Sequence, residues 1–383
     1  MIMGGYWPNW VSSQLPPEKI DWSKYDIMCY AFVVPSRDAS LTIGSSDSSL
    51  LMRMVKSAHA AESKLLLSLG GWGQSSGFSP SVASSAMIAK FVKSIRRVYD
   101  TYKLDGIDLD WEYPNNAAAG THSASDTKNF QSFLEALRQG LPSGALITAA
   151  VAPAPWLASS GNPAGSFARA ASALDYIMIM NYDTWGSSST PGPNAPLGNL
   201  CSNSSHPEAS AAAAVKQWAA AGMPRSKMLL GSPMYGYVST SSKMTLKQRT
   251  FEESEVKSVR RSVHSRPLSP RYDATLSGAE RRALTSGDGQ VNFDHLVSQG
   301  VLKLSGSEYV ASGGFKKYWD DCSDTPYLAN GKKVITYDDP DSLYDKGNFV
   351  KKAGLGGSSV WSVEGDVDSG ALVKAIRSGM GLS

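Results

Sequence analysis

The residues best suited to chemistry in this sequence are Asp108, Asp110 and Glu112, which occupy every second position of one short segment. The alternate positions are large and apolar, namely Ile107, Leu109 and Trp111. This period of two predicts a β-strand with three carboxylates on one face. Adjacent carboxylates on that face would lie about 7 Å apart, so we expect at least one pKa to be raised. The pattern favours general acid–base catalysis.

A purely structural interpretation makes the same segment a half-exposed edge strand with a polar face. Strands contain few aspartates, and a row of like charges on one face opposes folding. The catalytic interpretation is therefore the stronger one.

The composition limits the class of protein. The chain has 383 residues, of which 42% are hydrophobic, and a formal net charge of +3 without blocks of like charge. This balance argues against nucleic acid or an anionic membrane as the main partner. No apolar run approaches the roughly 20 residues that span a bilayer. The length suits one large α/β domain with an insertion, or two ordinary domains.

The N-terminus and the cysteines bear on the compartment. Strand-like sequence begins at about Gly4 without a basic, then apolar, then small-residue leader, which indicates a cytosolic protein or a sequence that starts at the mature end. Cys29 lies in an apolar strand and is expected to be a buried free thiol. Cys201 and Cys322 lie in polar segments, and the sequence leaves open whether they form a disulfide. The sequon at Asn203 leaves glycosylation open as well, since such triplets are common by chance.

Strand-sized apolar runs alternate with helical patterns along most of the chain. We expect strands at residues 5–10, 25–34, 64–71, 107–112, 146–151, 176–182, 227–235 and 357–363. We expect helices at residues 48–61, 82–102, 126–140, 207–221 and 369–377. Eight buried parallel strands separated by helices predict an α/β fold, the (β/α)8 TIM barrel, whose functional side chains lie at the C-terminal strand ends.

The connection between the seventh and eighth strands, about residues 237–333, is a long excursion. Helical patterns occur at residues 246–261 and 291–302, and no alternating strand pattern stands out. We interpret the excursion as mainly helical and loop sequence, not as an independent domain. Residues 1–383 would then form a single catalytic barrel domain.

Aromatic and polar residues gather at the predicted strand ends. Flat aromatic rings suit the faces of sugars, whereas carboxylates and hydroxyls suit sugar oxygens. Any single aromatic residue could serve packing alone, but their joint occurrence indicates a carbohydrate site. The residues concerned are Tyr6, Trp7, Phe32, Gly70, Gly71, Trp72, Glu112, Tyr113, Met180, Tyr182, Asp183, Met234, Tyr235 and Trp361.

With these motifs the chain resembles family 18 of the glycoside hydrolases, the chitinases, over residues 4–378. The main motif is Asp-x-x-Asp-x-Asp-x-Glu, formed here by Asp105, Asp108, Asp110 and Glu112. Four further matches follow the family's order: residues 68–71 (Ser-Leu-Gly-Gly), 180–183 (Met-Asn-Tyr-Asp), 235–236 (Tyr-Gly) and 361–362 (Trp-Ser).

The resemblance implies a role for each residue of the motif. Glu112 would protonate the glycosidic oxygen, while the substrate's own N-acetyl carbonyl attacks the anomeric carbon and gives an oxazolinium ion with net retention. Asp110 would orient the acetamido group and raise the pKa of Glu112 by charge repulsion. Asp108 would share a proton with Asp110. Tyr182 would hold the acetamido oxygen, and Asp105 would have a supporting role.

The resemblance also implies which residues contact the substrate. Trp361 would form the floor beneath the sugar at the cleavage point. Gly70 and Gly71 would let the backbone approach the substrate closely. The walls would be formed by Tyr6, Phe32, Trp72, Tyr113, Met180, Asp183, Met234 and Tyr235. Non-proline cis peptides are expected at Ala31–Phe32, Glu112–Tyr113 and Trp361–Ser362.

One departure from the family concerns the excursion. Many relatives carry a compact α+β insertion there, which walls one side of a deep groove. Residues 240–312 lack a strand-rich pattern. We therefore expect an open cleft and an endo-acting enzyme that cleaves chitin chains internally.

Two alternatives use the same barrel: an inactive chitin-binding lectin, and an endo-β-N-acetylglucosaminidase that acts on N-glycans. Such lectins typically lack the glutamate, whereas Glu112 is present, and the Trp-rich rim favours polymeric chitin over N-glycans. We expect a secreted, monomeric chitinase whose partners are chitin and chitooligosaccharides. We expect no cofactor, no metal, and neither nucleic acid nor a membrane as partner.

Overall fold

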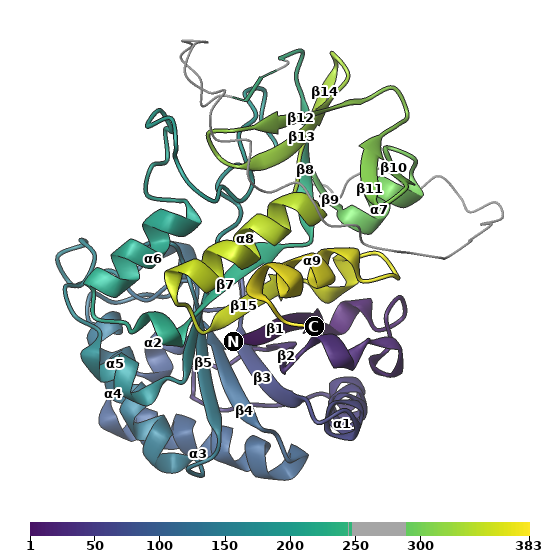
Figure 1. Cartoon of the computed structure of the whole chain (residues 1–383). Helices are drawn as coiled ribbons and strands as arrows, with labels where there is room; N and C mark the ends of the chain where they lie inside the picture. Colours follow the sequence, from purple (N-terminus) through teal and green to yellow (C-terminus); the bar gives the residue numbers. More distant parts are fainter. Residues whose placement is uncertain (244, 247–288) are drawn as a thin grey trace.

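The protein folds around a closed barrel of eight parallel strands in the order β1-β15-β7-β6-β5-β4-β3-β2 (Figure 1). The computed structural model describes residues 1–243, 245–246 and 289–383. The predicted TIM barrel is therefore confirmed. Its strands are β1 (Ile2–Pro8), β2 (Ile27–Val33), β3 (Lys64–Gly70), β4 (Gly106–Asp110), β5 (Leu146–Val151), β6 (Tyr176–Ile179), β7 (Met228–Pro233) and β15 (Gly357–Trp361).

Helices cover the outside of the barrel (Figure 1). They are α1 (Ser45–Ala60), α2 (Phe78–Ser81), α3 (Ser85–Tyr102), α4 (Asp126–Gly140), α5 (Ala168–Ala173), α6 (Ala211–Ala220), α8 (Pro340–Ala353) and α9 (Ala371–Met380). The sequence reading missed α8, although its signals were present. Asp339 caps its N-terminus in a capping box, Pro340 begins it, and Gly354 ends it in the left-handed conformation.

One apolar cluster lies inside the barrel, and a second lies between the barrel strands and the surrounding helices. The inner cluster includes Tyr6, Cys29 and Met178. Cys29 is a buried free thiol, as expected. The outer cluster includes Ile107, Leu109 and Trp111, whose ring stacks on Phe78 at 5.1 Å. The alternation in β4 thus turns the apolar residues outward and the carboxylates into the barrel.

The insertion between β7 and β15 differs from the prediction. It contains a five-stranded sheet in the order β12-β13-β14-β8-β9 and a two-stranded sheet of β10 and β11. The strands are β8 (Tyr235–Thr240), β9 (Gln290–Asn292), β10 (Leu302–Ser305), β11 (Glu308–Ala311), β12 (Lys316–Asp320), β13 (Thr325–Ala329) and β14 (Lys333–Thr336). Between β8 and β14, the only α-helix among the described residues is α7 (Phe293–Ser298). The prediction of a mainly helical excursion is therefore wrong there. The helical pattern predicted at residues 246–261 lies outside the described residues except for Leu246.

The strands of the insertion were not predicted because they are only three to six residues long, and because β8 pairs with β9 and β14, which lie far from it in sequence. Strand β8 pairs with β14, so that Val238 lies opposite Ile335. One local signal was available, the Asn330-Gly331 turn between β13 and β14, where Gly331 has a positive φ of 79°. The open cleft was inferred from a lack of strands in this region, so that inference loses its premise.

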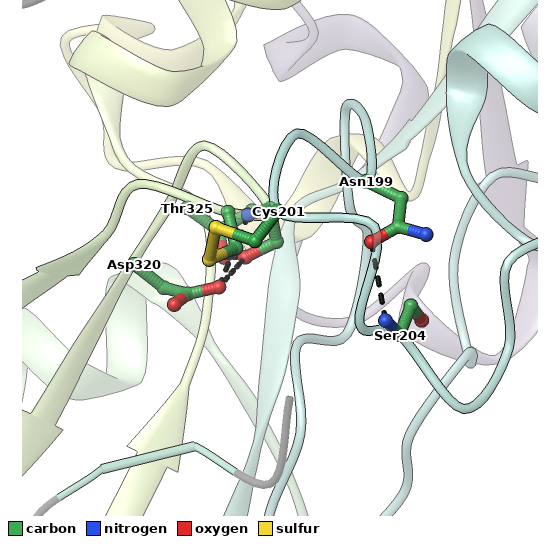
Figure 2. The surroundings of a disulfide bond; sticks show 7 residues. Asn199, Cys201, Ser204, Asp320 and Thr325 are labelled. Atoms are coloured by element: carbon green, nitrogen blue, oxygen red, sulfur yellow. Dashed lines mark hydrogen bonds between the residues drawn. A yellow bond between two sulfur atoms is a disulfide. The ribbon is translucent and has the colours of Figure 1, made fainter. Parts of the chain in front are cut away.

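A disulfide between Cys201 and Cys322 ties the insertion to the loop before α6 (Figure 2). It joins residues 121 positions apart, with 5.1 Å between their Cα atoms. The backbone N–H groups of Leu197 and Leu200 donate to the carbonyls of Ser323 and Cys322, each at 2.9 Å. The bond that the sequence left open is thus present. No helix in the described part of the chain combines the length and apolar character that crossing a bilayer requires.

Candidate active site

Strand register places Asp108 in a layer of hydroxyl groups inside the barrel. Asp108 lies opposite Ser68 of β3 and Thr148 of β5. Its carboxylate accepts hydrogen bonds from Ser68 Oγ at 2.7 Å, Thr148 Oγ1 at 2.6 Å and Tyr6 Oη at 3.0 Å. Burial raises the pKa of Asp108, and the three hydroxyl donors oppose that rise because they stabilise the carboxylate.

Asp110 has a different environment, although it is only two residues away. It is 4% exposed, and its Oδ1 is buried without a hydrogen-bond partner among the described residues. Burial raises the pKa of Asp110 well above its ordinary value, and the charges of Glu112 and Asp108 raise it further. The hydroxyl donors therefore favour the charged form of Asp108, whereas burial and two neighbouring charges favour the protonated form of Asp110.

Glu112 lies in the segment that follows β4, because the observed strand ends at Asp110 and not at residue 112 as the sequence predicted. Ser75 fixes this segment. Its Oγ accepts from the Glu112 N–H at 3.0 Å and lies 3.2 and 3.3 Å from the carbonyl oxygens of Gly71 and Asp110. Ser75 is 1% exposed. Ser75 was not among the predicted site residues, because the serine-rich segment around it is typical of a loop.

The pKa of Glu112 is raised to about 7. Burial is the main cause, a hydrogen bond from Tyr113 lowers the pKa, and the charge of Asp183 raises it. The expected repulsion between Glu112 and Asp110 raises the pKa of Asp110, and Asp183 is a further charge that raises the pKa of Glu112. A carboxyl group that keeps its proton near neutral pH can serve as a general acid.

Gly70 and Gly71 serve the packing of the protein itself. Both have a positive φ, 102° and 96°. A Cβ on Gly70 would lie 2.3 Å from the carbonyl oxygen of Asp110, and one on Gly71 would lie 2.8 Å from the ring of Phe32. Glycine is thus required by neighbouring protein groups at both positions, which is a different reason from the expected approach of the backbone to substrate.

An aromatic wall adjoins the carboxylates. Phe32 stacks on Trp361 with 5.5 Å between ring centroids, and Tyr6 lies 5.5 Å from Trp361. Trp10 extends the wall at 6.2 Å from Phe32 and is 59% exposed, yet it was absent from the predicted site. Trp72 is 69% exposed. All three expected cis peptides are present, Ala31–Phe32, Glu112–Tyr113 and Trp361–Ser362.

Another side of the site is formed by residues that follow β6 and by residues of β8. The ring of Tyr182 lies 6.1 Å from that of Tyr235, and burial raises the pKa of Tyr182 well above its usual value. The hydroxyls of Tyr235 and Tyr237 donate to Asp183 Oδ1 at 2.5 and 2.7 Å. Met180 is half-buried beside the inner apolar cluster.

Two predicted site residues lie away from this centre. Met234 is 0% exposed and packs in the outer cluster, so its side chain has no surface to offer a substrate in this structure. Its backbone N–H donates to the carbonyl of Trp361 at 2.9 Å. Asp105 precedes β4 and accepts from Leu65 N at 2.8 Å, while His59 Nε2 lies 2.9 Å from it. Asp105 therefore ties strands together outside the group of carboxylates.

A barrel that combines a buried carboxyl group, a carboxylate network and an aromatic wall is typical of the glycoside hydrolase class. Among the described residues, no group of His, Cys, Asp and Glu side chains is arranged to hold a metal ion. Residues 2–366 match the family described as Glycosyl hydrolases family 18. The chain belongs to this family.

Individual relatives agree with that membership. The chain is 37% identical over 387 residues to a chitinase-like effector of Moniliophthora roreri, covering 99% of this chain and 93% of that protein. It is 33% identical to a chitinase-like effector of Moniliophthora perniciosa, covering 100% and 87%. A chitinase structure from Rhizomucor miehei superposes with a TM-score of 0.79 at 32% identity, covering 99% of this chain and all of the other.

Proposed function

We propose that this protein is an active chitinase that hydrolyses β-1,4-linked N-acetylglucosamine polymers with retention of configuration. The observation that carries the proposal is the state of Glu112, a buried carboxyl group whose pKa is raised to about 7. A protonated carboxyl group at the end of a barrel strand can deliver a proton to a glycosidic oxygen at near-neutral pH.

In the proposed mechanism the substrate supplies the nucleophile. Glu112 donates its proton to the leaving oxygen as the acetamido carbonyl of the substrate attacks the anomeric carbon, which yields an oxazolinium ion. Asp110, whose raised pKa favours a protonated side chain, supports the acetamido group together with the hydroxyl of Tyr182. Water then opens the oxazolinium ion, and Glu112 recovers its proton from that water.

The remaining residues of the site complete the proposal. Asp108, held by three hydroxyl donors, supplies a fixed negative charge beside Asp110. Trp361 and Phe32 offer stacked rings to the faces of the sugars. We further propose that the protein acts on chitin and chitooligosaccharides outside the cell as a monomer, with residues 1–383 forming one domain. The Cys201–Cys322 disulfide supports an oxidising compartment.

A specific observation keeps a second candidate in view. The two relatives named above, which match this chain over most of their length, are called chitinase-like effectors. The alternative is therefore a barrel that binds chitooligosaccharides without hydrolysing them. The presence of Glu112, Asp110 and Tyr182 favours the enzyme.

Incubation of the purified protein with chitohexaose and, separately, with a high-mannose glycopeptide tests the proposal. We expect dimers and trimers from the hexamer, first formed as the β-anomer as retention requires, and no cleavage of the glycopeptide. Binding of chitohexaose without any product would favour the lectin, and cleavage of the glycopeptide alone would favour the N-glycan-directed enzyme.

A further inference from the structure

The carboxylate of Asp183 is held by the inserted sheet. Its Oδ1 accepts from the hydroxyls of Tyr235 at 2.5 Å and Tyr237 at 2.7 Å, both on β8. Gln290 lies opposite Tyr237 on the neighbouring strand β9. Its Nε2 donates to Tyr237 Oη at 3.1 Å. A chain of hydrogen bonds therefore runs from Gln290 through Tyr237 to Asp183.

The direction of these hydrogen bonds follows from which groups can donate a proton. The amide NH₂ of Gln290 can only donate, so Tyr237 Oη uses a lone pair to accept that bond. The single phenolic proton of Tyr237 then remains for Asp183, a carboxylate that can only accept. Gln290 thereby fixes the orientation of the hydroxyl that contacts Asp183.

The backbone of Asp183 is fixed by a second route that also leads to β8. Asp183 has a φ of 58°, in the left-handed region. Its N–H donates to Asn194 Oδ1 at 2.8 Å, and Asn194 Nδ2 donates to the carbonyl of Tyr235 at 3.1 Å. Asn194 is 2% exposed. The insertion therefore sets both the backbone and the side chain of Asp183.

The charge of Asp183 acts on the acid and its neighbours. It raises the pKa of Glu112, and it contributes to the raised pKa values of Tyr113, Tyr182 and Tyr235. The other acidic group that interacts with Glu112 is Asp110. Because the effect of a charge falls with distance, the place at which Asp183 is held matters.

We propose that Tyr237 and Gln290 are positioning residues through which the inserted sheet holds the Asp183 carboxylate and so keeps Glu112 protonated. This inference deepens the proposed function, because it concerns the acid on which that function rests. Neither residue needs to contact substrate for this role. The insertion then influences the chemistry of the barrel through the side chains of Tyr235, Tyr237 and Gln290.

Removal of the Tyr237 hydroxyl should lower the pKa of Glu112. In Tyr237→Phe, Asp183 Oδ1 loses the Tyr237 donor and keeps the Tyr235 donor, so the carboxylate either turns away or takes up a proton more readily. Each change reduces the negative charge that opposes ionisation of Glu112. Glu112 then loses its proton at lower pH, by about half to one pH unit. Gln290→Met should shift it in the same direction by less.

The test is an NMR titration of protein labelled with ¹³C at the glutamate carboxyl carbons, with the Glu112 signal assigned by its loss in Glu112→Gln. The matched control is Tyr337→Phe, because Tyr337 is 1% exposed and its buried hydroxyl has no hydrogen-bond partner among the described residues. We expect a lower titration midpoint for Tyr237→Phe and Gln290→Met and an unchanged midpoint for Tyr337→Phe.

An unchanged Glu112 midpoint in both folded variants would overturn the proposal. If Tyr237→Phe does not fold, Gln290→Met decides alone, because Gln290 is half-buried on a short strand. The titration needs no turnover. A protein that shows the shift but leaves chitohexaose intact would contradict the proposed function and support the positioning role.

Discussion

The backbone N–H of Glu112 donates to the Oγ of Ser75 at 3.0 Å, across 37 positions of sequence. The acid is therefore attached to the loop after β3 as well as to its own strand. The same hydroxyl lies 3.3 Å from the carbonyl of Asp110. Ser75 thus fixes the backbone on both sides of Trp111, and thereby the direction in which the Glu112 side chain points.

Replacing Ser75 by alanine should lower kcat about 10- to 100-fold with little change in KM, because a small displacement of a catalytic group is costly. The variant leaves the buried N–H of Glu112 unpaired, which should also cost about 1–3 kcal/mol of unfolding free energy. Steady-state kinetics on chitohexaose and urea unfolding measure the two effects. Ser81→Ala is the control, since Ser81 is also fully buried but bonds to the Ser36 carbonyl. Equal losses of kcat in both variants would contradict a specific role for Ser75.

Replacing Glu112 by glutamine should reduce turnover by a factor of about 10² to 10⁴, because the amide cannot donate a proton to the leaving oxygen. Binding of chitotetraose should persist, since the shape of the side chain is unchanged. Product analysis and titration calorimetry check the two parts. The control is Glu135→Gln, which alters an exposed ion pair with Arg169 and should leave activity unchanged. Near-full activity in Glu112→Gln would show that another group is the acid.

The pH dependence of kcat/KM should be bell-shaped. Glu112 must be protonated to act, so activity should fall as the pH rises through about 7, the value to which its pKa is raised. The acidic limb should arise from the coupled aspartates Asp108 and Asp110, so its midpoint belongs to the pair and not to either residue. Initial rates between pH 4 and 9 measure both limbs. A flat profile between pH 4 and 8 would contradict this account.

Replacing both Cys201 and Cys322 by serine should lower the free energy of unfolding by about 2–5 kcal/mol, since the bond closes a long loop. Thermal unfolding should show a lower Tm in the variant. Reductant should lower the Tm of the natural protein but leave that of the variant unchanged, because Cys29 is a free thiol. An identical response to reductant in both proteins would mean that the bond is absent in solution.

Asp294 in α7 should make stability depend on pH. Burial raises its pKa from 3.8 to about 7, aided by the charges of Asp366 and Asp368 and opposed by a backbone hydrogen bond from His295. The folded state therefore binds the proton more tightly than the unfolded chain. Its contribution is fully present below about pH 4 and is lost as the pH rises through about 7.

Asp294→Asn should accordingly gain about 1–3 kcal/mol relative to the natural protein at pH 8, and that gain should shrink towards pH 4. Urea unfolding at a series of pH values measures the difference. The control is Asp100→Asn, because the Asp100 side chain is 53% exposed. A constant difference from pH 4 to pH 8 for Asp294→Asn would contradict the raised pKa.

The sequence alone determined the barrel and the placement of its carboxylates. Alternation of acidic and apolar residues is a local property of one strand, so the inward direction of Asp108 and Asp110 could be read directly. The buried strands and several helices could also be predicted from the sequence, because each is defined by residues close together in the chain. The residue types of the family motif, including Glu112, needed no structure.

Only the tertiary structure decided how these groups are held and charged. The hydrogen bonds that Glu112 N–H donates to Ser75 and that Tyr237 Oη donates to Asp183 span 37 and 54 positions, and no local pattern encodes such pairs. The same holds for β8 of the inserted sheet, which pairs with the distant strands β9 and β14. Burial, which is the main cause of the raised pKa of Glu112, is a property of everything packed around a residue. The sequence therefore supplied the acid, and the fold decided its protonation and the residues that keep it in place.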